Sequence, residues 1–221
     1  MKCVILAAGS MLHREDPKSG SWPKEPKPKT MYHVRGEILL ERQVRLLREV
    51  GIEDIIVVVG YRKELIEQFV KKKNLKVSLT FCPESVNDAK WHRSGNYRHG
   101  MDSIRAGLKG IDDDVIFVMG DVYTTVNDLR QIVEYPDELT VWRGNGHNFH
   151  IFKVAKKYLP KLRVYNAVKG IPIHHFIFRE KNISFKGHKR LYKKWCRENT
   201  SLAAGTFDVD HYKRTDESRG L

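Results

Sequence analysis

The chain has 221 residues, of which 41% are hydrophobic, and it carries a formal net charge of +13 at pH 7. This composition suffices for one α/β core but leaves little room for a second complete domain, and no apolar run reaches the roughly 20 residues of a membrane helix. The three widely separated cysteines give no support to a disulfide framework or a zinc site, so we expect a soluble, cytoplasmic protein. Its basic surface should attract polyanions, whether nucleic acid, an acidic membrane or phosphorylated metabolites.

The first predicted element is a buried strand followed by a long loop. Residues 3–8 form a short apolar run that ends at Gly9, which is typical of a strand covered on both faces of a parallel sheet. Residues 10–29 are polar and rich in proline, which forbids regular structure. Loops of this length inside a compact domain usually carry function.

Strand and helix patterns then alternate up to about residue 135. Apolar residues recur at helical spacing over 40–47, 65–70 and after Met101, and β-branched or alternating runs occupy 55–59, 77–81 and 115–119. This alternation predicts an α/β fold with a doubly wound, mainly parallel sheet.

The second half has a mixed pattern. We predict short strands and basic helical segments packed on the same sheet, with the strands at 139–142, 150–154, 174–178 and 206–209 and the helices at 155–162 and 189–197.

Ligands of doubly wound sheets bind beyond the carboxyl ends of the strands. Residues 7–10, Ala-Ala-Gly-Ser, would let backbone amides approach a nucleobase or phosphate after the first strand, although tight turns also contain small residues for packing reasons. Lys24, Lys27 and Lys29 lie on the proline-stiffened loop, where lysine can neutralise a polyphosphate or simply face solvent.

Carboxylates mark two other strand ends. Asp121 follows the apolar run 115–119 and Gly120, a place suited to Mg²⁺ held by one or two carboxylates and phosphate oxygens; the alternative is a cap on the next turn. Asp208 and Asp210 are two residues apart, so a strand would point both to one face, where a cation relieves their repulsion. The alternative there is a solvated terminal strand.

The order of these segments resembles that of the nucleotidyltransferases of the glycosyltransferase-A-like fold, which activate sugar phosphates and alcohol phosphates. The resemblance covers the opening strand and its loop (4–10) and a lysine motif with the start of the following helix (28–43). It also covers a second strand with its turn (51–61) and a Gly-Asp pair after a third strand (118–121). Phe207-Asp208-Val209-Asp210 resembles the second metal site of that family.

The resemblance implies a Rossmann-like single domain over residues 1–221, with a nucleotide-binding half, 1–135, and an acceptor-binding half, 136–221. It implies Mg²⁺ as cofactor and a nucleoside triphosphate and a small phosphorylated acceptor as partners; nucleic acid is not expected, and a homodimer stays open. The implied nucleotide-binding residues are Leu6, Ala7, Ala8, Gly9, Ser10, Lys29 and Gly120. The implied catalytic residues are Lys29 and Arg14. The implied metal ligands are Asp121, Asp208 and Asp210.

The loop after Gly9 departs from the family pattern. The family usually has a second glycine two residues after Gly9 and an arginine two residues beyond that, whereas this chain has Met11 and His13 there, with Arg14 one step further. If Arg14 takes the role of that arginine, the loop must be rearranged.

The implied reaction is an in-line attack of an acceptor phosphate on the α-phosphorus of the triphosphate, with charge neutralised by Mg²⁺ and Lys29. One alternative is a glycosyltransferase of the same fold, which would normally show Asp-x-Asp in place of Gly120-Asp121. Another is a catalytically silent nucleic-acid or anion-binding protein, with the basic segment 179–197 as its candidate surface. His147, His150, His174 and His175 are interpreted as structural or exposed.

Overall fold

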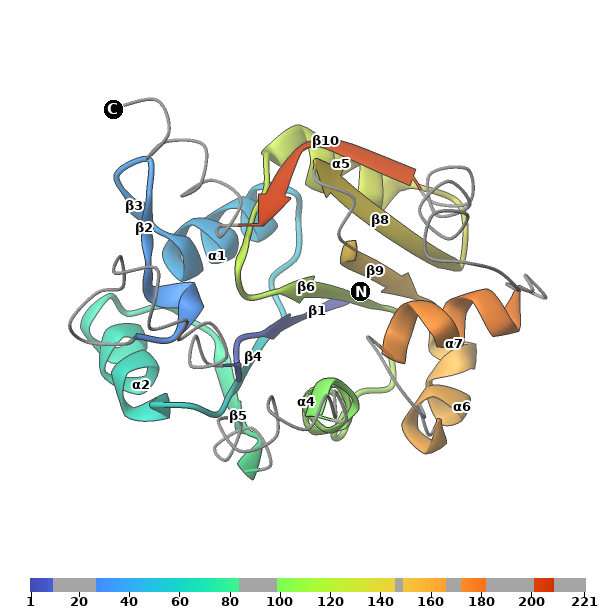
Figure 1. Ribbon diagram of the computed structural model, residues 1–221, viewed down its shortest axis with the longest axis horizontal. Coiled ribbons are helices and arrows are strands. Elements are labelled where there is room, and N and C mark those ends of the chain that lie inside the picture. Colours follow the sequence, from blue (N-terminus) through green and yellow to red (C-terminus); the bar gives the residue numbers. More distant parts are fainter. Residues whose placement is uncertain (10–26, 84–98, 146–148, 166–171, 182–200, 209–221) are drawn as a thin grey trace, which may run out of the picture.

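One mixed β-sheet organises the chain in the computed structural model (Figure 1). The structure describes residues 1–9, 27–83, 99–145, 149–165, 172–181 and 201–208. Within these residues the strand order is β5-β4-β1-β6-β9-β8-β10-β7. The strands are β1 (Lys2–Leu6), β4 (Ile55–Val59), β5 (Ser78–Phe81), β6 (Val115–Met119), β7 (Val122–Tyr123), β8 (Leu139–Asn145), β9 (Phe149–Val154) and β10 (Ser201–Asp208).

The first half of the chain builds the parallel part of the sheet. β1 pairs in parallel with both β4 and β6, and β4 pairs in parallel with β5. The second half adds antiparallel pairs, β6 with β9, β9 with β8 and β10 with β7, while β10 and β8 run parallel. The predicted α/β fold with a mainly parallel, mixed sheet is therefore confirmed.

Helices cover both faces of the sheet (Figure 1). α1 (Leu39–Glu49), α2 (Lys63–Lys72) and α5 (Val126–Glu134) pack on the face that contains Ile5, and α4 (His99–Gly107), α6 (Leu159–Val164) and α7 (Pro172–Glu180) pack on the face that contains Val4. Because β1 is apolar toward both faces, it can lie at the centre of the sheet between two helical layers.

Local sequence explains where α1 and α5 begin or end. Leu40, Val44 and Leu47 form the buried stripe of α1, and Gly51 follows the helix with a positive φ of 84° that glycine adopts without strain. The hydroxyl of Thr125 caps α5 by accepting a hydrogen bond of 3.2 Å from the backbone amide of Asp128. The β2–β3 hairpin (His33–Val34 and Glu37–Ile38) and a 3₁₀ turn η2 (Lys29–Met31) precede α1.

The predicted strand at 174–178 is wrong, because these residues belong to α7. Pro172 begins this helix, where its missing amide hydrogen costs no hydrogen bond, and Ile173, Phe176 and Ile177 are buried at helical spacing. The predicted helical segment 155–162 is confirmed as a 3₁₀ turn η4 (Lys156–Tyr158) and α6. The predicted helix at 189–197 and most of the loop 10–29 lie outside the described residues.

The described helices are all too short or too polar to cross a lipid bilayer.

Candidate active site at the carboxyl edge of the sheet

Lys29 and Asp121 form an ion pair although they are 92 positions apart in the chain. The Lys29 ammonium nitrogen lies 2.9 Å from Asp121 Oδ2, and the two side chains are only 15% and 18% exposed. Burial alone would raise the pKa of Asp121, but the Lys29 ammonium holds it below its ordinary value. The site therefore contains an ionised carboxylate beside a cation at neutral pH.

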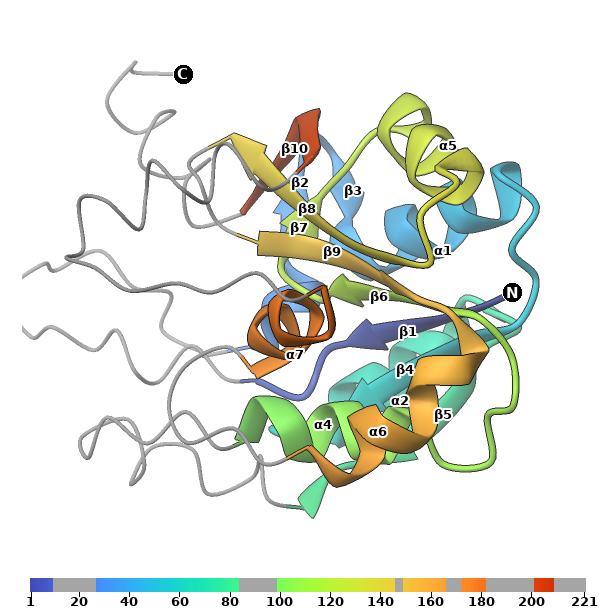
Figure 2. The same ribbon diagram turned by 90° about the vertical axis from the view of Figure 1, so that its right-hand side faces the viewer.

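The sheet places Asp121 at its functional edge. β1 and β6 run side by side toward the same edge (Figure 2), and Asp121 lies between the end of β6 at Met119 and the start of β7 at Val122. This edge is where ligands of doubly wound sheets bind. Lys29 begins the 3₁₀ turn η2, directly after Pro28.

Gly120 allows β6 to approach the end of β1 closely. A Cβ atom on this residue would lie 2.8 Å from the Cα of Ala7 and 2.8 Å from the carbonyl oxygen of Leu6, closer than backbone atoms tolerate. The Gly120 amide donates a hydrogen bond of 3.0 Å to that Leu6 oxygen. Only glycine fits here, and it brings Asp121 beside the turn that follows β1.

The turn after β1 is held by its backbone. The Ala7 amide donates to the Val58 carbonyl at 3.0 Å, and the Ala8 carbonyl accepts from the Tyr61 amide at 3.1 Å. Ala7 and Ala8 are buried, whereas Gly9 is exposed and has no atom within 4 Å of the position a Cβ would take. Leu6, the last residue of β1, is half-buried. The turn thus offers a backbone surface without bulky side chains.

The strand of Asp208 ends beside Asp121. β10 and β7 pair in antiparallel fashion, with Asp208 opposite Val122, the residue after Asp121. The sequence places these two aspartates 87 positions apart, and only the sheet order brings their backbones together. Three of the expected site residues, Ser10, Arg14 and Asp210, lie outside the described residues.

A divalent metal fits the chemistry of this edge. Among the side chains that the structure describes, no group of three or more His, Cys, Asp and Glu residues gathers into a cage. Mg²⁺ does not need such a cage, because it is commonly held by one or two carboxylates together with phosphate oxygens and water. The ionised Asp121, at the end of a rigid strand, is a donor of this kind.

His150 belongs to this region, although sequence alone favours a structural or exposed role for it. It lies in β9 and is 2% exposed, and its Nε2 has no hydrogen-bond partner among the described residues. Burial lowers the pKa of His150 from 6.5 to about 4, although the negative charge of Asp121 opposes this shift. The imidazole is therefore neutral at pH 7, and its interaction with Asp121 places it near the ion pair.

This shift predicts a pH-dependent stability. Between pH 6.5 and 4 the imidazole takes up a proton in the unfolded chain but not in the folded one, so the free energy of unfolding should fall by up to about 3 kcal/mol as the pH decreases. Chemical denaturation at several pH values measures this slope. His150→Gln should remove most of it, and the same replacement at the exposed His33 is the control; an unchanged slope in His150→Gln would contradict the assignment.

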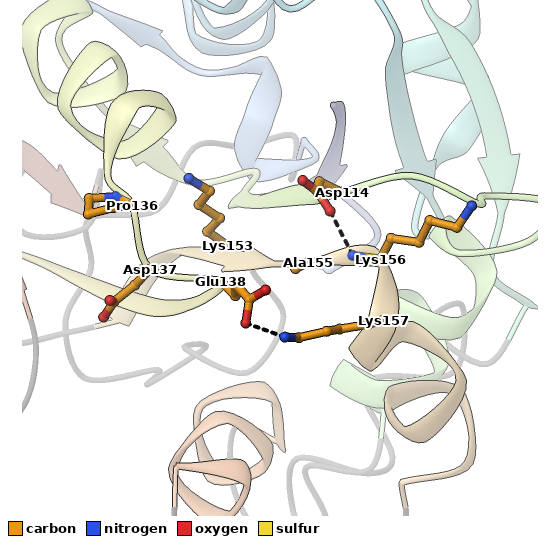
Figure 3. A pocket seen from close by; sticks show the side chains of 8 residues that line it. All are labelled: Asp114, Pro136, Asp137, Glu138, Lys153, Ala155, Lys156 and Lys157. Atoms are coloured by element: carbon orange, nitrogen blue, oxygen red, sulfur yellow. Dashed lines mark hydrogen bonds and ion pairs between the residues drawn. The ribbon is translucent and has the colours of Figure 1, made fainter.

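A hollow lies at the opposite edge of the sheet, near the start of β6 (Figure 3). Its volume is about 430 Å³, and its lining comprises Asp114, Pro136, Asp137, Glu138, Lys153, Ala155, Lys156 and Lys157. Its lysines already have partners within the protein. Lys157 pairs with Glu138 at 2.6 Å, Lys156 pairs with Asp112 at 2.8 Å, and Lys153 donates to the carbonyls of Val133 and Tyr135. We place the candidate site at the carboxyl edge because ligands of doubly wound sheets bind there.

The model of the MobA-like NTP transferase domain matches residues 3–182 of this chain. The match includes Lys29, Gly120 and Asp121 and ends before Asp208.

Two curated proteins are similar to parts of the chain. The choline-phosphate cytidylyltransferase of Streptococcus pneumoniae is 38% identical over 77 residues, which are 35% of this chain and 31% of that protein. The UTP–glucose-1-phosphate uridylyltransferase AglF of Haloferax volcanii is 31% identical over 121 residues, 55% of this chain and 43% of that protein. The chain thus matches less than half the length of either relative.

The fold also occurs in a solved structure. Rv0371c from Mycobacterium tuberculosis, in its complex with manganese, superposes on this chain with a TM-score of 0.57 and 17% sequence identity. The superposition covers 98% of each of the two chains. At this identity the likeness concerns the fold.

Proposed function

The chain belongs to the family of MobA-like NTP transferase domains, and from this premise we propose that it transfers a nucleoside monophosphate from a nucleoside triphosphate to a small phosphorylated acceptor, releasing pyrophosphate. The observation that carries the proposal is the ion pair of Lys29 and Asp121, 2.9 Å apart at the carboxyl edge of the sheet and beside the turn after β1. At this place the Lys29 ammonium could bind phosphates, and the Asp121 carboxylate could bind a metal ion.

Mg²⁺ is the proposed cofactor. Asp121 would hold it, and Asp208 and Asp210 are the proposed further ligands. When bound, the metal would neutralise charge on the triphosphate. The proposal is supported by the ionised state of the Asp121 carboxylate, by the position of Asp208 opposite Val122 and by the manganese complex of the protein with the same fold.

The remaining roles fall to side chains and backbone of the first half. Once phosphates are present, Lys29 would turn its ammonium from Asp121 toward them and neutralise the charge that develops on the leaving group. Leu6 to Ser10 and Gly120 would receive the nucleotide along backbone without large side chains. Arg14 is the proposed second cation. The nucleotide would thus occupy residues 1–135, and the acceptor residues 136–221.

The acceptor class is a sugar phosphate or an alcohol phosphate. The names of the two relatives support it, since one concerns choline phosphate and the other glucose 1-phosphate. A phosphate nucleophile is already ionised at neutral pH, so the site needs no general base, and positioning and charge neutralisation carry the reaction. These substrates also favour the cytoplasm as the compartment.

The experiment that tests this function measures pyrophosphate release from ATP, CTP, GTP and UTP with Mg²⁺ and a panel of sugar and alcohol phosphates. Release that requires one triphosphate and one acceptor together is the expected result. A glycosyltransferase would instead consume a nucleotide sugar, and an anion-binding protein would release no pyrophosphate across the panel. Either outcome would overturn the proposed function.

A further inference from the structure

Gln43 of α1 contacts the short segment that carries Asp121. Its side-chain nitrogen donates to the Met119 carbonyl at 3.1 Å and to the Val122 carbonyl at 2.7 Å. These two carbonyls flank Gly120 and Asp121 in the chain, and a primary amide has two hydrogens to donate. Gln43 thus donates both hydrogens of its amide group to the two ends of one turn.

Arg42 extends this contact to the far end of β7. Its guanidinium donates to the Thr124 carbonyl at 3.3 Å, pairs with Glu37 at 2.7 Å and lies over the ring of Tyr123, 4.2 Å from the ring centroid. The backbone of residues 119–124 is therefore held at three carbonyls by consecutive residues of one helix.

The same helix is tied to the segment of Lys29. The Leu39 amide at the start of α1 donates to the Tyr32 carbonyl at 3.0 Å, and the Tyr32 amide donates to the Lys29 carbonyl at 3.2 Å. A short chain of hydrogen bonds thus connects Lys29 through α1 to the turn of Asp121. These bonds hold the backbone segments that carry Lys29 and Asp121 in place relative to each other.

Packing alone does not explain the amide of Gln43. The residue is 1% exposed, and its Oε1 has no hydrogen-bond partner in the described part of the chain. A buried polar atom without a partner destabilises the fold, and an apolar side chain of similar size would fill the same space without that penalty. The two donated hydrogen bonds are what an apolar residue could not supply.

We propose that Gln43 is a positioning residue for the proposed nucleotidyl transfer: by holding the carbonyls of Met119 and Val122 it sets the place of the Asp121 carboxylate relative to Lys29. This inference rests on the proposed function for its kinetic consequence, but its structural consequence can be measured without catalysis. Gln43 itself touches no substrate in this role.

The test compares Gln43→Met, which keeps the length and loses the donors, with Val44→Ala, which removes buried volume from the next position of α1. Val44→Ala controls for lost stability, and both are studied below their melting temperatures. We expect Gln43→Met to lower kcat at least tenfold with KM for the triphosphate within about threefold. Exchange of the Gly120 amide hydrogen, followed by NMR, should accelerate at least about tenfold. Val44→Ala should leave both quantities near wild type.

Gln43→Met behaving like Val44→Ala in kcat and in exchange would overturn the positioning role. If the wild type transfers no nucleotide to any acceptor, the proposed function fails, and the exchange of the Gly120 amide still decides the role of Gln43. If Gln43→Met does not fold, Gln43→Asn replaces it. That amide is one methylene too short to reach both carbonyls, so accelerated exchange is expected again, and wild-type exchange would overturn the proposal.

Discussion

Replacing Asp121 with asparagine is expected to lower nucleotidyl transfer by about 1,000-fold, the upper range for loss of one preorganised electrostatic group. The substitution keeps the shape of the side chain and removes the negative charge that now faces Lys29 at 2.9 Å. A neutral amide holds Mg²⁺ poorly, because hard divalent cations prefer charged oxygen donors. Initial rates of pyrophosphate release at saturating substrates measure the loss.

Asp113 provides the matched control for this change. Its carboxylate pairs with the amino terminus of the chain at 2.9 Å, but at the opposite edge of the sheet, just before β6. Asp113→Asn should therefore retain kcat within about twofold. If Asp121→Asn keeps a tenth or more of the wild-type rate, Asp121 does not have the proposed role in the reaction.

Replacing Lys29 with methionine is expected to lower kcat/KM by about 100-fold, because one cation would no longer neutralise the triphosphate and its leaving group. The substitution should also move the acidic limb of the pH–rate profile upward. Burial raises the pKa of Asp121 and Lys29 lowers it, so without the ammonium the burial effect dominates and the carboxylate binds a proton at higher pH. Values of kcat/KM from pH 4 to 8, at a Mg²⁺ concentration that does not saturate the enzyme, measure both effects, because kcat/KM reports the pKa values of the free enzyme.

Lys156→Met is the control for the lysine, since Lys156 pairs with Asp112 at 2.8 Å on the edge away from the site. It should leave the rate and the pH profile unchanged. An acidic limb that stays in place in Lys29→Met would contradict the electrostatic coupling of Lys29 to Asp121, whatever the size of the rate loss.

The parallel half of the fold could be predicted from the sequence because its signals are local. Strands β4 and β6 are continuous β-branched or apolar runs, and α1 has a clear stripe that ends at Gly51, so the predicted positions agree with the structure. The strand prediction at 174–178 failed because a short apolar run such as Phe176-Ile177-Phe178 fits a buried helix as well as a strand, and Pro172 was the signal that favours the helix. The cap Thr125 could likewise have revealed α5.

The candidate site was predictable only in part. The strand end pointed to Asp121 and the family resemblance to Lys29, but their pairing depends on the path of η2 and on the close approach that Gly120 allows. Gln43 looks like one polar residue on an amphipathic helix, and its role depends on which carbonyls the sheet brings to it. The contact between β7 and β10 likewise depends on strand order, which no local pattern encodes.

The most direct test of nucleotidyl transfer follows the α- and γ-phosphorus of the triphosphate separately with radioactive labels, using the triphosphate and acceptor that support pyrophosphate release. We predict that the α-label joins the acceptor, that the γ-label leaves as pyrophosphate in equal amount, and that Asp121→Asn lowers the rates of both by about 1,000-fold. A γ-label on the acceptor, or an α-label found only in free nucleotide, would contradict it.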